Sequence, residues 1–328
     1  MPHQPHETIW SLATATVRSR TLQVIADLGV ADHVGDSPVN VEELALACEA
    51  DADALERALR LLAAHGIFER NGAGFAHTEG SRLLRSDHPM SMRAFARMMG
   101  MASFTTSFSQ LGHAVRTGTP ALEIIAPDGL FAHLQRHPEE ASIFDEAMTA
   151  KAAGDLGAVL GTYDFTRFTT IADIGGGRGH LLRAVLEAAP EATGLLFDLP
   201  AVVDSLDMDV ERLALRSGDF FVDPLPAADV YVLMEVIHDW GDAQAVAILS
   251  AVRRAAPSGA TVVIIEGFAD DERLDPVVQT LDMIMLTITG GRERTVAQVG
   301  RLLGDSGLRL TRHLETPGAL GIVEAVPV

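Results

Sequence analysis

Four short stretches of this sequence carry residue types that could bind and activate a small molecule. Three alternating glycines, Gly175, Gly177 and Gly179, lie in TIADIGGGRGH, where a short apolar run meets a helical pattern. Glycine tolerates positive φ and lets a ligand approach the backbone closely, while the free N–H groups of the following helix face the turn. A dinucleotide-binding fingerprint would place its third glycine one residue later, where this chain has His180. The pattern therefore predicts a binding turn and disfavours a nicotinamide dehydrogenase.

The other three stretches place polar side chains directly after apolar runs. Asp198, in LLFDLP, follows the turn by about twenty residues, where a carboxylate can accept hydrogen bonds from both hydroxyls of a ribose. In SGDFF, Asp219 can bind an exocyclic amine and Phe220 can stack on a base. His238 and Asp239, in VIHDWGD, add a group that exchanges protons near neutral pH. Each residue also has a structural interpretation: a helix cap for Asp198, core packing for Phe220 and a turn histidine at 238.

The elements that must position these residues alternate between strands and helices after about residue 155. Strands are expected over residues 171–174, 194–197, 213–216, 230–233 and 261–266, and helices over 180–189 and 243–256. Such alternation predicts a parallel sheet covered on both faces, with ligands over the carboxyl ends of the strands. Two last strands, 308–314 and 319–326, have no helix between them. We expect them to form an antiparallel hairpin at the sheet edge.

The first 150 residues have a mostly helical pattern. Residues 8–34 predict one or two amphipathic helices, and residues 38–84 predict two helices and a short hairpin, the order of a winged helix. Asn40 or Asp51 could cap these helices, and Gly66 could end the second. A DNA-reading helix needs surrounding Lys and Arg residues that contact phosphates. Because these helices are largely acidic, a structural or dimerising role is favoured. Between residues 89 and 151, methionine-rich helices could form core or line a pocket for a flat aromatic molecule.

Composition excludes several classes of protein. A chain of 328 residues suggests two domains, and no apolar run approaches the roughly 20 residues that a membrane span requires. The N-terminus lacks a basic segment followed by an apolar one, so a cytoplasmic location is expected. The net charge of −20 disfavours nucleic acid and anionic membranes as partners. The single cysteine, Cys48, cannot form an internal disulfide, and its helical setting indicates packing.

Taken together, five stretches resemble the S-adenosylmethionine-dependent O-methyltransferases of the plant caffeate and bacterial natural-product type. They are IADIGGGRGH, LLFDLP, SGDFF, LMEVIHDWGDA and TGGRERT. The resemblance covers essentially the whole chain and implies an α/β fold. Residues 156–328 would form a Rossmann-like class I methyltransferase domain, residues 1–95 an N-terminal, mostly helical winged-helix dimerisation domain, and residues 96–155 a helical linker that contributes to the substrate pocket. The protein would be a homodimer formed through its N-terminal domain.

The resemblance also implies residue roles in cofactor binding. Gly175 and Gly177 would pack against the methionine portion of S-adenosylmethionine, and Asp198 would hold its ribose. Asp219 and Phe220 would contact its adenine. No metal would be required.

For the acceptor, the resemblance implies His238 as general base, with Glu266 and Glu293 as acids beside it. Met148 and Met285 would hold the ring of a small aromatic substrate, with Asp239 nearby. A phenol of pKa near 10 facing a histidine near 6.5 leaves a gap of about 3.5 units, or roughly 5 kcal/mol, against proton transfer. A carboxylate hydrogen-bonded to the other imidazole nitrogen narrows that gap.

This chain departs from the family pattern at two places. Glu235 occupies a position that is commonly basic in plant members, and Lys151 and Ala152 replace residues that often contact the cofactor. These departures keep one alternative open, a non-methylating relative, resembling a hydroxylase or decarboxylase, with the same fold and cofactor. The winged-helix pattern leaves a second alternative, a regulator that senses a metabolite through its C-terminal domain, although the acidic N-terminal helices disfavour it.

Overall fold

A computed structural model describes residues 4–72, 74–206, 211–270 and 272–328 of the chain. The chain folds into two compact units, one made of Met1–Thr105 with Glu139–Lys151 and the other of Thr106–Pro138 with Ala152–Val328. Within the described ranges, no helix has the length and apolar character needed to cross a membrane.

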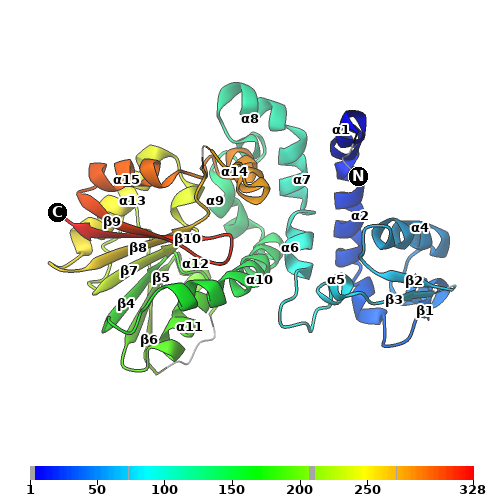
Figure 1. The fold of residues 1–328 in the computed structure, drawn as a ribbon, viewed down its shortest axis with the longest axis horizontal. Coiled ribbons are helices and arrows are strands. Elements are labelled where there is room, and N and C mark those ends of the chain that lie inside the picture. Colours follow the sequence, from blue (N-terminus) through cyan, green and yellow to red (C-terminus); the bar gives the residue numbers. More distant parts are fainter. Residues whose placement is uncertain (1–3, 73, 207–210, 271) are drawn as a thin grey trace. The chain divides into compact units, whose positions relative to one another are not determined.

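After two N-terminal helices, the first unit has the helix–helix–hairpin order of a winged helix, in the blue part of the ribbon (Figure 1). Its elements are α1 (Pro5–Ala13), α2 (Ala15–Asp27), η1 (Val30–His33), β1 (Val39–Asn40), α3 (Val41–Ala47), α4 (Ala52–Ala63), β2 (Glu69–Asn71), β3 (Gly74–Ala76), α5 (Glu79–Arg82) and α6 (Arg93–Met98). Both predicted caps are confirmed, because the Asn40 side chain accepts from Glu43 N and that of Asp51 from Ala54 N. The two-residue strand β1, which pairs with β3, was not expected from the sequence.

Apolar side chains from these helices and from the hairpin form the core of the first unit. Ile25 of α2, Leu44 of α3, Leu59 of α4 and Phe75 of β3 are all buried in one cluster. Cys48 belongs to the same cluster, which confirms its predicted packing role. Helices α2 and α4 contact each other within this unit.

Five further helical segments follow in the chain. They are α7 (Ala102–Ser109), α8 (Leu111–Thr117), η2 (Ala121–Ile124), α9 (Gly129–Arg136) and α10 (Pro138–Thr162). Helices α7 and α10 each cross the boundary between the two units.

A seven-stranded sheet forms the centre of the second unit, in the order β6-β5-β4-β7-β8-β10-β9. Its strands are β4 (Thr170–Ile174), β5 (Thr193–Asp198), β6 (Leu213–Ser217), β7 (Val230–Met234), β8 (Thr261–Glu266), β9 (Leu308–Glu315) and β10 (Gly321–Pro327). The first five are parallel and β10 is antiparallel to both of its neighbours. All seven predicted strands, and the antiparallel hairpin at the sheet edge, are therefore confirmed.

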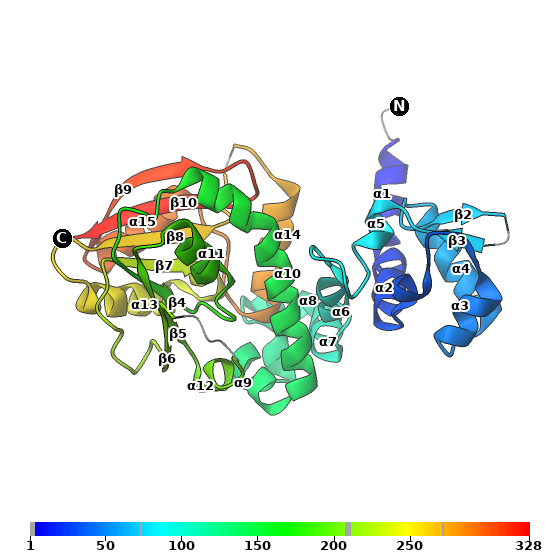
Figure 2. The same ribbon diagram turned by 90° about the horizontal axis from the view of Figure 1, so that it is seen from below.

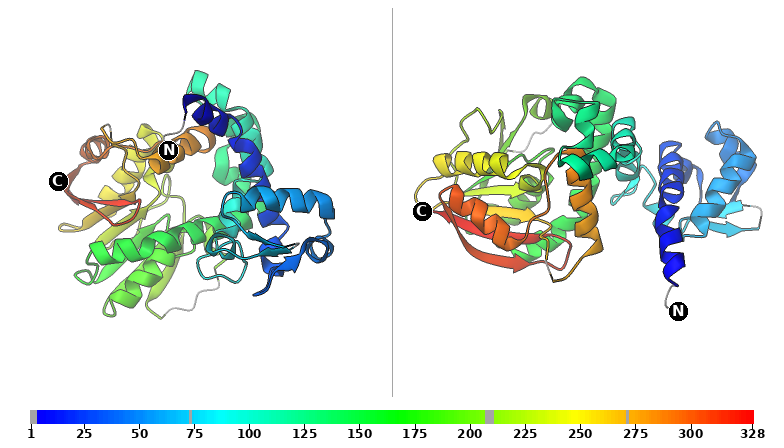
Figure 3. Two further views of the ribbon diagram at one scale, coloured as in Figure 1. Left: turned by 45° about the vertical axis from the view of Figure 1, so that its right-hand side comes forward. Right: turned by 90° about the horizontal axis from the view of Figure 1, so that it is seen from above.

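Neighbouring residues of each strand point to opposite sides of this sheet. Because apolar residues lie on both sides, helices cover both faces. Ala172 packs in one core with α13 (Asp242–Ala255) and α15 (Val296–Asp305), which lie side by side in the right-hand view of Figure 3. Ile171 packs in the other core with α11 (His180–Ala188), seen over the opposite face in Figure 2. The remaining helical segments are α12 (Pro200–Val203), η3 (Ile237–Asp239) and α14 (Pro276–Ile288).

The strand order places a switch point between β4 and β7. From β4 the chain moves outward to β5 and β6, and then crosses to β7 on the other side of β4. Ligands of open α/β sheets bind in the crevice outside the carboxyl ends of the strands at such a point. In this chain, that edge carries the glycine turn and His238.

Candidate active site

The glycine turn after β4 has the backbone that its sequence predicts. Gly175, Gly177 and Gly179 have φ values of 71°, 55° and 72°, in the left-handed region that glycine adopts most easily. The Gly175 N–H donates to Phe197 O at 2.8 Å, which ties the turn to the end of β5. A Cβ at Gly175 would lie 3.0 Å from a methyl of Val236, so the turn also packs against the segment after β7.

Asp198, the last residue of β5, is hydrogen-bonded to this turn. One of its carboxylate oxygens accepts from the Gly177 N–H at 2.7 Å, and the other accepts from Leu199 N, also at 2.7 Å. The parallel register that pairs Ile174 with Phe197 brings the two strand ends level. The predicted neighbours Gly177 and Asp198 are therefore in direct contact.

The stretch after β6 joins the same region through its aromatic side chains. Phe220 lies 3.9 Å from the position that a Cβ would take on Gly175, and its ring meets that of Trp240 edge to face at 5.9 Å. Asp219 sits in the same tight turn, where its carboxylate accepts from Phe221 N at 2.8 Å. The ends of β4 and β6 and the segment after β7 thus meet around Phe220.

His238 lies in η3, the short turn that follows β7, and only 6% of it is exposed. Its Nδ1 is 2.9 Å from Glu293 Oε1, a residue 55 positions further along the chain. Its backbone N–H donates to Glu266 Oε1 at 2.9 Å. Asp239 Oδ1 is 3.9 Å from Nε2, which makes no hydrogen bond within the described ranges. His238, Asp239, Glu266 and Glu293 therefore form one cluster.

The acids of this cluster change the pKa of the histidine. Burial lowers the pKa of His238, but the hydrogen bond to Glu293 and the negative charges of Asp239, Glu266 and Glu293 outweigh burial and raise it to about 9. Glu266 is shifted as well. Burial raises its pKa, the positive charge of His238 opposes that rise, and the charge of Glu293 adds to it, which gives a pKa of about 7.

The two predicted acceptor-pocket methionines lie in different units. Met285 is buried in α14, and the Thr289 hydroxyl is 3.6 Å from its sulfur. Met148 is half-buried on the part of α10 that belongs to the first unit. Its role beside the substrate stays a prediction.

The structure adds a buried acid that the sequence reasoning missed. Asp173 lies in β4 beneath the glycine turn, where a Cβ on Gly176 would be 2.6 Å from its carboxyl carbon. Within the described residues, its Oδ2 is buried without a hydrogen-bond partner, and burial followed by the charge of Asp198 raises its pKa to about 7. The signal was present in the sequence as an acid inside the apolar run TIADI. Two carboxyl groups at the turn suit a cationic ligand, such as a molecule with a sulfonium and an ammonium group.

A mixed sheet with this strand order and with the glycine turn at its switch point defines a class I methyltransferase domain. The comparisons with known proteins agree with that class. Residues 108–309 match the O-methyltransferase domain, and residues 10–87 match the O-methyltransferase dimerisation domain. The chain belongs to this family of S-adenosylmethionine-dependent O-methyltransferases, as its sequence predicted.

Three relatives illustrate the range of the family. The phenazine O-methyltransferase PhzM of Lysobacter antibioticus is 38% identical over 317 residues, which cover 94% of this chain and 93% of the relative. A solved O-methyltransferase from neocarzinostatin biosynthesis, in complex with S-adenosylmethionine and 2-hydroxy-5-methyl naphthoic acid, is 33% identical with a TM-score of 0.83 over 100% of both chains. The 8-amino-8-demethylriboflavin N,N-dimethyltransferase of Streptomyces davaonensis is 37% identical over 299 residues, 87% of this chain and 85% of the relative. The cofactor of the chain is S-adenosylmethionine, and its family acts on aromatic natural-product substrates.

Proposed function

We propose that this enzyme methylates a hydroxyl group, phenolic in type, of a small aromatic or polyketide-like metabolite, with His238 as general base. The observation that carries the proposal is the buried contact of 2.9 Å between His238 Nδ1 and Glu293 Oε1, at the sheet edge that also carries the glycine turn. A histidine held in this way is a proton acceptor with a defined orientation.

Five residues around the turn are proposed to hold the cofactor. Gly175 and Gly177 allow its methionine portion to approach the backbone, Asp198 accepts from the ribose hydroxyls, and Asp219 and Phe220 contact the adenine. The sulfonium supplies an electrophilic methyl group for an in-line displacement. The protein therefore has two main tasks, which are to place the acceptor oxygen on the line of attack and to remove its proton.

The tautomer of His238 follows from its partner. A carboxylate oxygen of Glu293 accepts from Nδ1–H, so Nε2 carries the lone pair that can take the acceptor proton. With the pKa of His238 raised to about 9, the gap to a phenol of pKa near 10 narrows to about 1 unit, or roughly 1.4 kcal/mol. Glu293 is proposed to orient and charge-stabilise the imidazole, and Glu266 to hold its backbone.

Met285 is proposed to contact the acceptor, with Asp239 beside the reacting hydroxyl, and Met148 is proposed as a further substrate-binding residue. The protein is proposed to act as a homodimer through its dimerisation domain. Helix α1 is consistent with this, since it has no buried residue and exposes Ile9, Trp10 and Leu12.

The test is label transfer from S-adenosylmethionine with a labelled methyl group to a panel of phenols and naphthols. Wild-type protein should label at least one of them, and His238→Ala should lose most turnover while keeping its affinity for S-adenosylhomocysteine. Turnover by His238→Ala equal to that of the wild type would remove the histidine from its assigned role.

A relative that methylates nitrogen makes aromatic amines a necessary second panel. Transfer to amines alone would replace the hydroxyl acceptor by a nitrogen one. Binding of a phenol and of S-adenosylmethionine without any S-adenosylhomocysteine formed would favour the non-methylating alternative.

A further inference from the structure

The turn that carries His238 accepts hydrogen bonds from a buried arginine, Arg294. Its side chain is among the largest that are fully buried, and only 2% of the residue is exposed. One guanidinium nitrogen donates to Ile237 O at 3.0 Å and another donates to Trp240 O at 2.7 Å. These two carbonyls lie on either side of His238, and the last carbonyls of a short helix have no partner within the helix itself. A single planar group therefore spans the whole turn.

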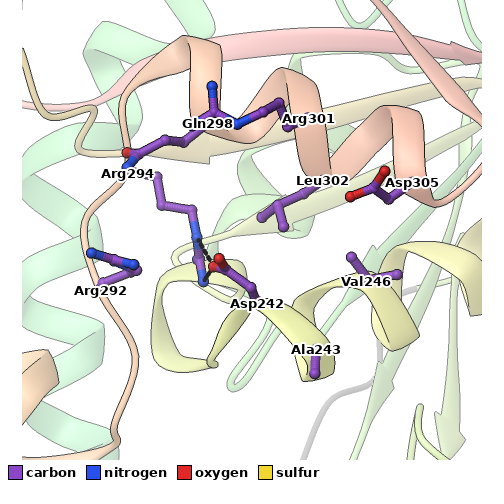
Figure 4. Close-up of a pocket in the computed structure, with 9 residues that line it drawn as sticks. All are labelled: Asp242, Ala243, Val246, Arg292, Arg294, Gln298, Arg301, Leu302 and Asp305. Carbon is purple, nitrogen blue, oxygen red and sulfur yellow. Dashed lines mark hydrogen bonds and ion pairs between the residues drawn. The ribbon is translucent and has the colours of Figure 1, made fainter. Parts of the chain in front are cut away.

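The charge of Arg294 is balanced by Asp242, the first residue of α13. Nε and Nη2 of Arg294 donate to Asp242 Oδ1 at 3.0 and 2.8 Å, as the dashed lines in Figure 4 show. The Asp242 side chain is 62% exposed at the edge of a cavity of about 560 Å³ between α13 and α15. The guanidinium thus connects the turn of His238 to the start of the helix that follows it.

The two residues before Arg294 also contact His238. Arg292 N donates to His238 O at 2.8 Å, and Glu293 supplies the carboxylate on Nδ1. The segment is itself anchored, because Glu293 N donates to Asp282 Oδ1 at 2.8 Å and Ala269 N donates to Arg294 O at 3.0 Å. Glu293 and the turn are therefore fixed to one short piece of chain.

We propose that Arg294 is a positioning residue for the reaction, which holds the 237–240 turn so that the His238 imidazole stays aligned with Glu293 and with the acceptor. This inference rests on the proposed function of His238. The planar fork of arginine can donate to two carbonyls and a carboxylate at once, whereas the single ammonium of lysine cannot span them. Arg294→Met leaves the Ile237 and Trp240 carbonyls without this donor, so a loss of stability is expected whether or not Arg294 also positions His238.

The experiment compares Arg294→Lys, Arg294→Met and Asp242→Asn with Arg301→Lys. Arg301 is an exposed arginine of α15 that lines the same cavity, so Arg301→Lys controls for the loss of an arginine there. The readouts are kcat and KM on the phenol labelled best by the wild type, the Kd of S-adenosylhomocysteine, and the NMR titration of the ¹³C-labelled His238 ring, assigned with His238→Gln. Because a small displacement of a catalytic group can lower rates about 100-fold, both Arg294 variants should lose between about 10- and 100-fold in kcat.

The same variants should change acceptor KM and cofactor Kd by less than about threefold, since the contacts that bind these molecules are intact. The His238 ring should titrate at lower pH in both Arg294 variants, because its contact with Glu293 loosens. Asp242→Asn should give a smaller change in the same direction, and Arg301→Lys should match the wild type. This combination separates a positioning role from a change in binding.

A wild-type kcat and an unchanged His238 titration in Arg294→Lys and Arg294→Met would overturn the proposal, whatever their thermal stability. If Arg294→Met does not fold, Arg294→Lys and Asp242→Asn decide by the same criterion. If the wild type labels no acceptor, the proposed function fails, and the ring titration still tests the positioning of His238 without turnover. The two failures are therefore distinguishable.

Discussion

At the scale of single residues, the site is a set of coupled charges around one imidazole. With a pKa of about 9, His238 carries a proton at neutral pH and must lose it before it can accept one from a phenol. A free histidine titrates near 6.5, so the folded state gains stability from this proton at pH below about 6.5 and loses that gain as pH rises through about 9. The same acids that make His238 a stronger base therefore move its working range upward.

This arrangement predicts a pH profile that depends on Glu293. In the wild type, kcat/KM should rise with pH up to about 9. In Glu293→Gln, fewer negative charges offset the effect of burial, so the pKa of His238 should fall and the rising limb of the profile should move down by at least about one pH unit. The maximum rate should fall about 10- to 100-fold. The profile is measured by label transfer between pH 5.5 and 10, with exposed Glu187→Gln as the control. A rising limb that stays at the wild-type pH in Glu293→Gln would contradict the role of Glu293 in raising the pKa of His238.

Asp173 predicts an effect on stability that is opposite to that of His238, because its charged form is the unfavourable one in the folded protein. Its pKa is about 7 in the folded state and about 3.8 when exposed, so ionisation destabilises the wild type as pH rises from about 4 to 7. Asp173→Asn removes the charge and should raise the free energy of unfolding above pH 7 by up to about 4 kcal/mol, the equivalent of roughly three pKa units. Urea unfolding without cofactor at pH 5 and pH 8 measures this, and the gain should be larger at pH 8.

The cofactor provides the control for Asp173. A cation bound over the glycine turn offsets the buried negative charge, so S-adenosylmethionine should stabilise Asp173→Asn less than the wild type. An equal gain at both pH values, with equal stabilisation by the cofactor, would contradict a raised pKa for Asp173 in the folded protein.

At the scale of elements, the sequence predicts what local patterns determine. Apolar runs with β-branched residues predict all seven strands, and the residues at the carboxyl ends of β4, β5 and β7 meet as expected because parallel strands end at one edge. The segment from 290 to 294 could not be placed in this way. Its contact with His238 joins residues 55 positions apart, and the burial of Arg294 exists only once α13 and the turn pack together.

Gly291 is the residue of this segment that allows the closest approach to the turn. A Cβ there would lie 1.9 Å from His238 O and 2.7 Å from Trp240 N, both of them backbone atoms that cannot rotate away. Gly291→Ala should therefore displace the turn, lower the free energy of unfolding by about 1–3 kcal/mol and reduce label transfer more than about 10-fold.

The control for Gly291 is a glycine with free space around it. Gly304 in α15 has no atom within 4 Å of its Cβ position, so Gly304→Ala should leave label transfer unchanged and stabilise the helix by up to about 1 kcal/mol. Urea unfolding and label transfer are measured on both variants. Wild-type activity and stability in Gly291→Ala would mean that the turn can move without harm.

At the scale of the whole molecule, helix α1 is, among the described helices of the first unit, the one that has no buried residue and carries several exposed large apolar side chains. The second unit closes its sheet between helices, with a core on each face. In the first unit, α1 carries large apolar side chains that contact too little of their own unit to be buried, with Ile9, Trp10 and Leu12 exposed by 69%, 72% and 74%. An exposed apolar stretch of this kind marks an interaction surface, and the dimerisation-domain match begins at residue 10.

Charged substitutions on α1 should therefore separate the protomers. Ile9→Glu with Trp10→Glu places two carboxylates where apolar contacts between copies are expected, and burying an unpaired charge at an interface is unfavourable by several kcal/mol. Sedimentation equilibrium of the wild type should give twice the mass of 34.9 kDa, and the double variant should give the monomer mass. Val328→Glu, which places a carboxylate at another apolar position that is 67% exposed, should stay dimeric. A double variant that sediments as a dimer would move the interface away from α1, because its charges would then face solvent in both states.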